Sequence, residues 1–362
     1  MQKRGIGLVR EGNIESAVFG QPDRASELAK FVCKVAGVFC DNIKDVWQLF
    51  GQSAGSFVNA DVVLIAGPTA SGKSTAALAL AERIGGVIVN TDSMQIYREA
   101  SILTARPGES ETIRTPHLLY GHVGVQEHYD IARYAVDAAR TLCNLCASGR
   151  VPIFVGGTGL YFGALTQGIS DMPQVPQAVR TNARTRRENL GADAFFAELA
   201  GRDPQTASLL RASDTQRVLR AWEVLEATGR PLAQWQKGVR VPALRAGLTV
   251  ARFVVSPPRP ELHRRIEKRF DAMLASGAME EAKCLQSLDP VLPAAKILGL
   301  RELNAVEAGM MTWGEARLAA IAATRQYAKR QLTWFRHRMA NWTWIEANDE
   351  SDTLRKLASY FE

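Results

Sequence analysis

Eight consecutive residues have the types and spacing of a phosphate-binding loop: Gly67, Pro68, Thr69, Ala70, Ser71, Gly72, Lys73 and Ser74. They fit the pattern G-x-x-x-x-G-K-[ST], in which backbone N–H groups converge on a polyphosphate and the lysine neutralises its oxygens. An apolar run precedes the loop and an Ala/Leu-rich stretch follows it, so the strand–loop–helix context is present. We therefore predict a phosphate site with Lys73 as its cation and Ser74 as the Mg²⁺ ligand. The loop alone leaves open which phosphate compound binds and whether a phosphoryl group moves.

A carboxylate follows the next apolar run. The segment Asn90-Thr-Asp-Ser-Met-Gln-Ile-Tyr-Arg98 comes directly after Val-Ile-Val at 87–89. In a parallel sheet we expect its start to fall beside the phosphate loop, where Asp92 would hold Mg²⁺ through water or take a proton from a substrate. A second interpretation is equally open on position alone, in which Asp92 or Ser93 is the N-cap of a helix.

A glycine-rich turn ends the third apolar run. Gly156-Gly-Thr-Gly-Leu-Tyr161 follows Val-Pro-Ile-Phe-Val at 151–155. Paired glycines permit close approach of the backbone to a ligand, and Thr158 offers a hydroxyl group. A tight turn without a ligand is the competing interpretation, and the motif alone does not decide between them.

A basic segment near the C-terminus has a composition suited to nucleic acid. Residues 317–338 contain six Lys/Arg and no acid. On a helix Arg325, Lys329 and Arg336 fall in a narrow arc beside an apolar stripe, where they would line a groove and contact phosphates. The alternative is an ordinary solvated basic face with aromatic core residues. The aromatic residues able to stack on unpaired bases are Tyr327 and Trp334.

The elements that position these residues alternate between strands and helices. Short runs rich in Val and Ile, separated by helical patterns, predict an α/β fold with a parallel sheet and helices on both faces. In such a sheet ligands lie beyond the carboxyl ends of the strands, where the three turns fall. The predicted strands are 62–66, 87–89, 151–155 and 250–255, and the predicted helices are 73–84, 131–147 and one that begins after Pro260.

Composition shifts divide the chain further. We predict an N-terminal extension of unknown role at 1–60, a first core part at 61–176, a helical, Arg-rich insertion at 177–236, a second core part at 237–345 and a tail at 346–362. The extension carries seven bases and six acids, so the net charge of +7 arises elsewhere. That excess suggests a polyanionic partner.

Composition also excludes some classes of protein. Among the 362 residues no apolar run reaches the length of a membrane span, and no signal-peptide layout is present, so we expect a cytoplasmic enzyme. The five cysteines lack a second ligand pair at metal-binding spacing, which favours structural thiols over zinc. Nothing in the sequence demands more than a monomer.

Together these segments resemble the tRNA dimethylallyltransferase (tRNA isopentenyltransferase) family. The similarity extends over roughly residues 61–345. The sequence shows no C-terminal zinc finger of the kind found in eukaryotic members, so we expect the bacterial type. One departure is Leu300, where the family usually has an aromatic residue. The phosphate loop is common to many proteins, but the ordered set of motifs is specific. It comprises GPTASGKS at 67–74, TDSMQIYR at 91–98, GGTGLY at 156–161, QRVLR at 216–220 and KRQLTW at 329–334.

The resemblance implies a P-loop NTPase-like, doubly wound parallel sheet with a helical insertion that clamps the anticodon stem-loop. It implies transfer of a dimethylallyl group from dimethylallyl diphosphate to N6 of the adenine 3′ to the anticodon, in tRNAs that read codons beginning with U. The loop would then hold the diphosphate leaving group with Mg²⁺, helped by Lys73 and Arg265. Asp92 would accept the N6 proton, and Thr158 would bond to the substrate.

The resemblance also implies a set of tRNA contacts, since the target adenine must leave the anticodon stack to reach the catalytic residues. They are Asp92, Ser93, Met94, Gln95, Thr158, Arg180, Gln216, Arg217, Val218, Leu219, Arg220, Lys296, Arg301, Lys329, Arg330, Gln331, Trp334 and Arg336. Two alternatives share parts of this pattern. An adenylate isopentenyltransferase acting on free AMP or ATP needs no RNA clamp, and a P-loop small-molecule kinase explains only the loop and Mg²⁺.

Overall fold

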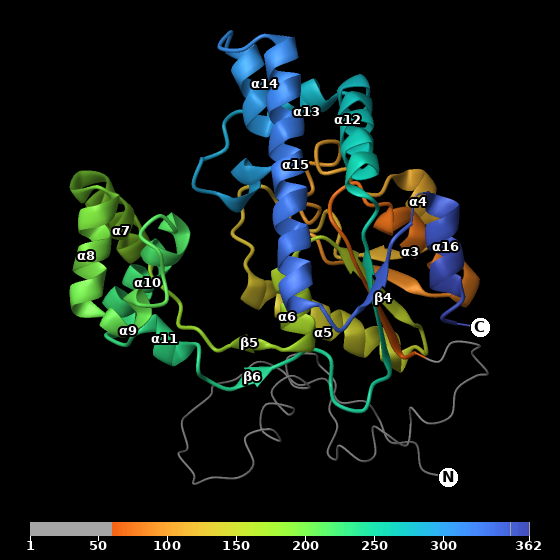
Figure 1. Cartoon of the computed structure of the whole chain (residues 1–362), viewed down its shortest axis with the longest axis horizontal. Helices are drawn as coiled ribbons and strands as arrows, with labels where there is room; N and C mark the ends of the chain where they lie inside the picture. The colour runs from red at the N-terminus through yellow and green to blue at the C-terminus, as the bar shows by residue number, and fades with distance from the viewer. Residues whose placement is uncertain (1–59, 348, 362) are drawn as a thin grey trace, which may run out of the picture. The chain divides into compact units, whose positions relative to one another are not determined.

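The computed structural model describes residues 60–347 and 349–361, which are built around a parallel sheet (Figure 1). In this part of the chain six strands are hydrogen-bonded in the order β3-β2-β4-β1-β7-β8. Every pairing in this sheet is parallel, which confirms the α/β fold class. The strands are β1 Val62–Ala66, β2 Val87–Asn90, β3 His117–Leu118, β4 Pro152–Gly156, β7 Val250–Val255 and β8 Thr343–Ile345.

Helices cover both faces of the sheet, and strand β1 shows how its side chains divide between them. Val62 and Leu64 join the cluster formed with α5 and α6, whereas Val63 and Ile65 pack with α3. All five β1 residues are buried, so the strand is a continuous apolar run, as a parallel sheet covered on both faces requires. These helices are α3 Lys73–Ile84, α5 Ile131–Ala147 and α6 Gly159–Thr166.

Two long helices, α12 Arg259–Ala275 and α15 Trp313–Arg338, pack against each other. Thr312 and Glu315 form a capping box at the start of α15, so this helix begins well before the basic segment. The apolar side chains of α12 are buried in the contact between the two helices. The shared cluster contains Leu262, Ile266, Phe270, Ala320, Ile321 and Ala328. The remaining elements around the sheet are α4 Glu109–Arg114, α13 Ala278–Cys284, η1 Pro293–Lys296, α14 Leu300–Glu307 and α16 Glu350–Ala358.

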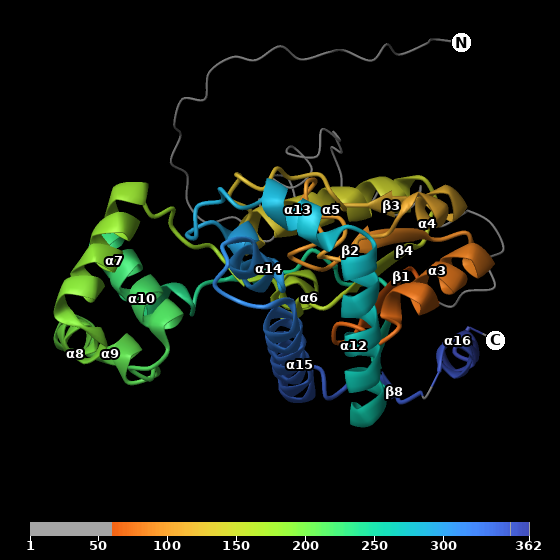
Figure 2. The same ribbon diagram turned by 90° about the horizontal axis from the view of Figure 1, so that it is seen from above.

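The helices α7 to α10 form a group to one side of the sheet (Figure 2). Together with α11 they lie between β5 and β6 and have a core of their own. Phe195, Leu199 and Trp222 are among its buried side chains. The two chain segments that lead to and from these helices pair as an antiparallel ribbon, β5 Ile169–Ser170 with β6 Arg240–Val241. The helices are α7 Gln177–Leu190, α8 Ala192–Arg202, α9 Pro204–Ala207, α10 Thr215–Thr228 and α11 Leu232–Trp235. The domain boundaries stated above stay a prediction.

Several elements of the structure were not indicated by the sequence, among them β3, β8 and α16. Strands β3 and β8 are only two and three residues long, too short to show a periodic pattern. Helix α16 lies within the predicted tail, and Leu357 and Phe361 are buried in the cluster that includes α3. This end of the chain is therefore part of the core packing.

Some sequence predictions fall outside the described residues, among them nearly all of the N-terminal extension and two of the cysteines. Of the others, Cys143 and Cys146 are half-buried free thiols on α5 and Cys284 is exposed. Burial raises the pKa of Cys146 to about 11. No helix in the described ranges is long and apolar enough to span a membrane.

Candidate active site

Three turns meet beyond the carboxyl ends of β1, β2 and β4. The sheet order places β4 between β1 and β2, so the turn at 156–159 separates the other two. Gly67 N donates to Gly156 O over 3.3 Å, and Thr158 N donates to Thr91 O over 3.1 Å. Long-range pairing places β4 between β1 and β2, yet the Asp92 carboxylate is near enough to Lys73 to act on its pKa, so the start of the Asp92 segment lies beside the phosphate loop, as expected. All three turns form one edge, as predicted.

The phosphate loop presents an uncapped helix N-terminus. Gly72 has φ 88° and precedes α3, whose first turn contains no acid, and no side chain in the described part of the chain caps it. The N–H groups of its first turn and the positive end of its dipole suit an anion. Ser74 lies exposed in this first turn, where its hydroxyl can reach a metal ion held by phosphate oxygens.

Lys73 is buried at the centre of the loop. Its Nζ donates to Pro68 O over 3.2 Å, and its side chain is only 8% exposed. Burial lowers the pKa of Lys73 from 10.5 to about 8, an effect that the Asp92 carboxylate opposes and the charge of Arg269 reinforces. Lys73 and Arg269 together carry more positive charge than the Asp92 carboxylate neutralises. An anionic group bound at the loop would offset this excess and favour the charged form of Lys73.

Two arginines of α12 add positive charge to the same place. Arg265 Nη1 donates to Ser71 O over 3.1 Å, and its Nε donates to Glu261 over 2.6 Å. Arg269 Nη2 donates to Thr104 O over 3.2 Å, and burial lowers its pKa while Asp92 raises it. The structure thus places Arg265, the residue predicted to bind diphosphate, against the phosphate loop.

Asp92 lies in a tight turn. Its N–H donates to Asn90 Oδ1 over 2.8 Å, and its Oδ1 accepts from Met94 N over 2.9 Å. No helix begins at this point of the described chain, so the helix N-cap interpretation is wrong and the carboxylate caps only a turn. A β-carbon at Gly157 would lie 3.4 Å from Asp92 Oδ2, which shows that this oxygen faces the 156–159 turn.

Thr158 connects the turn to its neighbours. Its Oγ1 accepts from Ser93 N over 2.9 Å and lies 3.2 Å from Ser93 Oγ. Thr158 also shares a hydrogen bond with Tyr327 of α15, and burial raises the pKa of that tyrosine. Gln95 contributes in another way, because its Nε2 donates to Thr104 O and Ala105 O over 3.0 and 2.8 Å. Gln95 thus fixes the position of the backbone at residues 104–105.

Two glycines of the turn are required by close packing. A β-carbon at Gly156 would lie 2.0 Å from Thr91 O, and one at Gly159 would lie 2.3 Å from the Trp334 ring. The half-buried Trp334 therefore packs against the turn at the start of α6. Packing against Thr91 and Trp334 is thus sufficient to explain why glycines occupy 156 and 159, and no ligand is needed for that explanation. Trp334, which was expected to stack on RNA, also has a structural role.

A groove of ≈ 660 Å³ is lined by residues of α15 and of the helical insertion. Arg217 of α10 faces the basic side of α15 across it, so the structure brings together two predicted RNA-contact segments that are far apart in sequence. Arg330 lies over the ring of Tyr327, with 5.7 Å from guanidinium carbon to ring centroid. The lining residues are Arg217, Gln326, Lys329, Arg330, Thr333, Trp334, His337 and Arg338.

Sequence reasoning missed half of this lining. Gln326, Thr333, His337 and Arg338 were not named, although 326, 330, 333 and 337 follow the helical spacing of one face and would have been found by extending that pattern. The prediction that Arg325, Lys329 and Arg336 line one groove is wrong, because only Lys329 lines it. Arg325 is ion-paired with Glu267 of α12 and is absent from the lining, as is Arg336.

The other predicted RNA contacts lie elsewhere. Val218 is 2% exposed and Leu219 is half-buried in the core of the insertion, because these positions form the inner face of α10. The side chain of Val218 therefore has almost no surface to offer to RNA, whereas a contact at Leu219 stays a prediction. Arg220 lies 3.8 Å from the buried Glu223, and burial lowers its pKa. Gln216 is exposed on α10, whereas Arg180 is half-buried on α7 and its charge acts on Glu223.

The segment around η1 and α14 does not reach the groove. Lys296 is exposed on η1, and Arg301 is 88% exposed and pairs with Glu302 over 3.1 Å. Leu300 is 3% exposed in the main core, so it cannot stack on a base. The apolar residue at this position serves packing alone.

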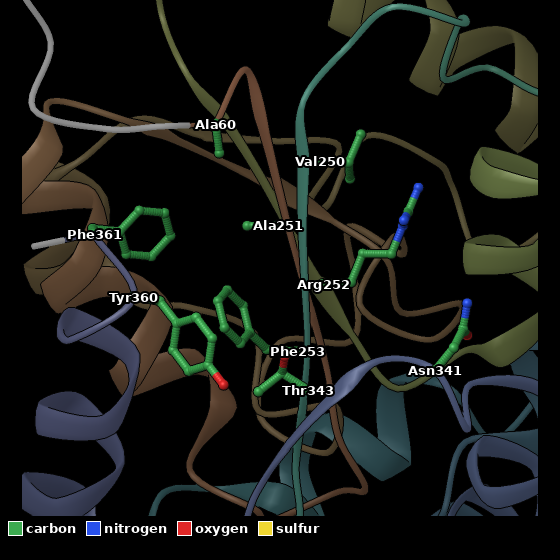
Figure 3. Close-up of a pocket in the computed structure, with 9 residues that line it drawn as sticks. All are labelled: Ala60, Val250, Ala251, Arg252, Phe253, Asn341, Thr343, Tyr360 and Phe361. Atoms are coloured by element: carbon green, nitrogen blue, oxygen red, sulfur yellow. The ribbon is translucent and has the colours of Figure 1, made fainter.

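A second hollow of ≈ 250 Å³ lies at the amino-terminal end of β7 (Figure 3). The rings of Phe253 and Tyr360 meet there edge to face at 5.1 Å. Its lining contains neither a carboxylate nor a thiol. Because the three turns lie at the opposite ends of the strands, this hollow is separate from the candidate site.

No cluster of three His, Cys, Asp or Glu side chains able to hold a metal ion occurs in the described ranges. The exposed hydroxyl of Ser74 fits the role of a protein ligand for a metal ion.

Comparisons with known proteins agree with this geometry. The family model described as IPP transferase matches residues 95–338, and the model described as Isopentenyl transferase matches residues 60–123. A tRNA dimethylallyltransferase of Sinorhizobium medicae is 48% identical over 290 residues, which are 79% of this chain and 95% of that protein. One of Chelativorans is 51% identical over 279 residues, which are 76% of this chain and 95% of that protein.

Two solved structures are also similar. The full-length tRNA isopentenylpyrophosphate transferase from Bacillus halodurans has 29% identity and a TM-score of 0.58, covering 83% of this chain and 96% of its own. A structure described as a eukaryotic dimethylallyltransferase acting on tRNA has 25% identity and a TM-score of 0.66, covering 82% of this chain and 77% of its own.

Proposed function

Because this chain belongs to the tRNA dimethylallyltransferase family, we propose that it prenylates tRNA. It transfers a dimethylallyl group from dimethylallyl diphosphate to N6 of the adenine on the 3′ side of the anticodon, in tRNAs that read codons beginning with U, and releases diphosphate. The observation that carries the proposal is that a phosphate loop, a carboxylate turn and a basic groove lie together.

The residues divide the reaction between them. The N6 lone pair attacks the first carbon of the allyl group while its bond to the diphosphate oxygen breaks, and Asp92 accepts the proton that N6 loses. The departing charge is held by the N-terminal amides of α3, by Lys73 and by Arg265. Mg²⁺ bound to Ser74 and the diphosphate would lower the charge of the leaving group.

The groove decides between this function and an enzyme for free nucleotides. Arg217, Lys329 and Arg330 line it beside Trp334, an arrangement that matches phosphates and an unstacked base. An enzyme that acts on a free nucleotide or a small-molecule kinase substrate would not require these positive charges to bind its substrate. We further propose that the protein acts in the cytoplasm as a monomer.

Labelled dimethylallyl diphosphate tests the proposal. The protein is incubated with an unmodified anticodon stem-loop, with the same RNA carrying guanine in place of the target adenine, and with AMP or ATP. Label is expected only in the adenine-containing RNA and only with Mg²⁺ present. Label in AMP alone would establish the adenylate enzyme, and ATP consumption without prenyl transfer would establish a kinase.

A further inference from the structure

The side-chain amide of Gln331 forms hydrogen bonds inside the protein through both its oxygen and its nitrogen. Its Oε1 accepts a hydrogen bond from Thr69 N over 2.9 Å, and its Nε2 donates one to Gly157 O over 2.8 Å. The side chain is 6% exposed. A residue that sequence similarity placed among the RNA contacts therefore has almost no surface to offer to RNA.

These two bonds add a side-chain link between the phosphate loop and the 156–159 turn, which are otherwise joined at the strand ends by the Gly67 N to Gly156 O hydrogen bond. Thr69 belongs to the phosphate loop, and Gly157 precedes Thr158, whose hydroxyl bonds to Ser93 next to the catalytic carboxylate. A β-carbon at Gly157 would lie 2.2 Å from Gln331 Nε2, so the glycine is what lets the amide approach. One side chain of α15 thus sets the spacing between the loop and the turn.

The same helical segment also forms part of the groove. Lys329, Arg330 and Trp334 line it, on either side of Gln331 in sequence, while Gln331 itself points inward. Because a helix is stiff over one turn, these groove residues and the two catalytic turns are joined through a short, packed element.

We propose that Gln331 is a positioning residue, which holds the phosphate loop and the 156–159 turn at the spacing that prenyl transfer requires and makes no contact with RNA. The proposal rests on the proposed function. Since a misplacement of one ångström costs on the order of 100-fold in rate, losing both bonds is expected to lower turnover much more than RNA binding.

The test compares Gln331→Met with Thr324→Val. Methionine keeps the length of the side chain and removes both hydrogen bonds. Thr324 lies on the same helix, and its hydroxyl bonds only to Ala320 O of that helix, so its replacement by valine is a matched control. Three quantities are measured: amide hydrogen exchange in the two turns, kcat and KM for prenyl transfer, and the Kd for the stem-loop.

Gln331→Met is expected to speed exchange at 67–72 and 156–159 about tenfold and to lower kcat by roughly 10- to 100-fold. The Kd for RNA should stay unchanged, and Thr324→Val should match the unaltered protein in all three measurements. If Gln331→Met does not fold, Gln331→Glu keeps the acceptor for Thr69 N and removes the donor to Gly157 O, so only the 156–159 turn should exchange faster.

Two results would overturn the proposal. Unchanged exchange in both turns would show that the amide does not hold them, and a weakened Kd with unchanged kcat would show that Gln331 is an RNA contact. Failure of the proposed function is a different result, namely no prenyl transfer by the unaltered protein. Hydrogen exchange would still test the hydrogen-bonded link in that case.

Discussion

Replacing Lys73 by methionine is expected to stabilise the free protein while it abolishes activity. The Lys73 side chain is 8% exposed, and burial lowers its pKa from 10.5 to about 8. The folded protein therefore binds this proton less tightly than the unfolded chain does. Below pH 8 the charged lysine lowers the free energy of unfolding, and the penalty disappears as the pH rises from 8 to 10.5.

The size of the effect follows from these values. A pKa lowered from 10.5 to about 8 corresponds to about 3 kcal/mol against the charged form. Methionine removes that penalty but also removes the hydrogen bond to Pro68 O, worth about 1 kcal/mol. We expect a net gain of about 2 kcal/mol at pH 7, which for a folded part of this size corresponds to a Tm increase of roughly 3 °C.

Urea unfolding of both proteins between pH 7 and 10.5 measures this difference directly. Inorganic diphosphate with Mg²⁺ provides a second arm. At about 100 times its Kd it should stabilise the unaltered protein by about 2.7 kcal/mol and the variant by less. Lys268→Met is the control, because Lys268 is exposed on α12 and its loss should change stability by less than about 0.5 kcal/mol.

The reasoning about Lys73 is refuted by either of two results. One is a variant that is less stable than the unaltered protein at pH 7. The other is a stability difference that stays constant as the pH rises to 10.5, because the buried charge would then not be its cause.

Three further predictions concern the carboxylate, the packed turn and the groove. Asp92→Asn should lower single-turnover prenyl transfer by roughly 10²- to 10⁴-fold, as expected for loss of a general base, with the Kd for the stem-loop unchanged. Gly159→Ala, whose β-carbon would lie 2.3 Å from the Trp334 ring, should reduce unfolding free energy by about 1–3 kcal/mol. Gly163→Ala on the same helix meets nothing within 4 Å and should raise it by about 0.5–1 kcal/mol. Removing one groove charge should reduce the slope of log Kd against log salt by about 0.7. The groove variants are Arg217→Ala, Lys329→Ala and Arg330→Ala.

Each of these predictions has a result that contradicts it. Near-normal transfer by Asp92→Asn would remove Asp92 from the role of base. Equal stability of the two alanine variants, measured by urea unfolding, would mean that the Trp334 contact does not restrict the turn. An unchanged salt slope, with Arg325→Ala as a control that breaks the pair with Glu267, would make the groove an ordinary solvated surface.

The sequence determined the elements whose cause is local. The apolar runs of β1, β2 and β4 are continuous because strands buried on both faces need no alternation, so the runs alone located them. The phosphate loop was equally evident, since its glycine, lysine and serine act through the helix that follows them. Strands as short as β3 left no such pattern.

Only the tertiary structure decided which residues meet. That β4 lies between β1 and β2 depends on strand pairing, and this order puts the 156–159 turn between the loop and Asp92. Arg217 and Lys329 share a groove although they are far apart in sequence, and the β5–β6 ribbon that joins the insertion to the core has no local pattern that specifies it. Gln331 and Val218 lie in segments that read as RNA-binding, yet both are buried. The direction in which a side chain points depends on the packing of its whole helix, and that packing is a property of the fold.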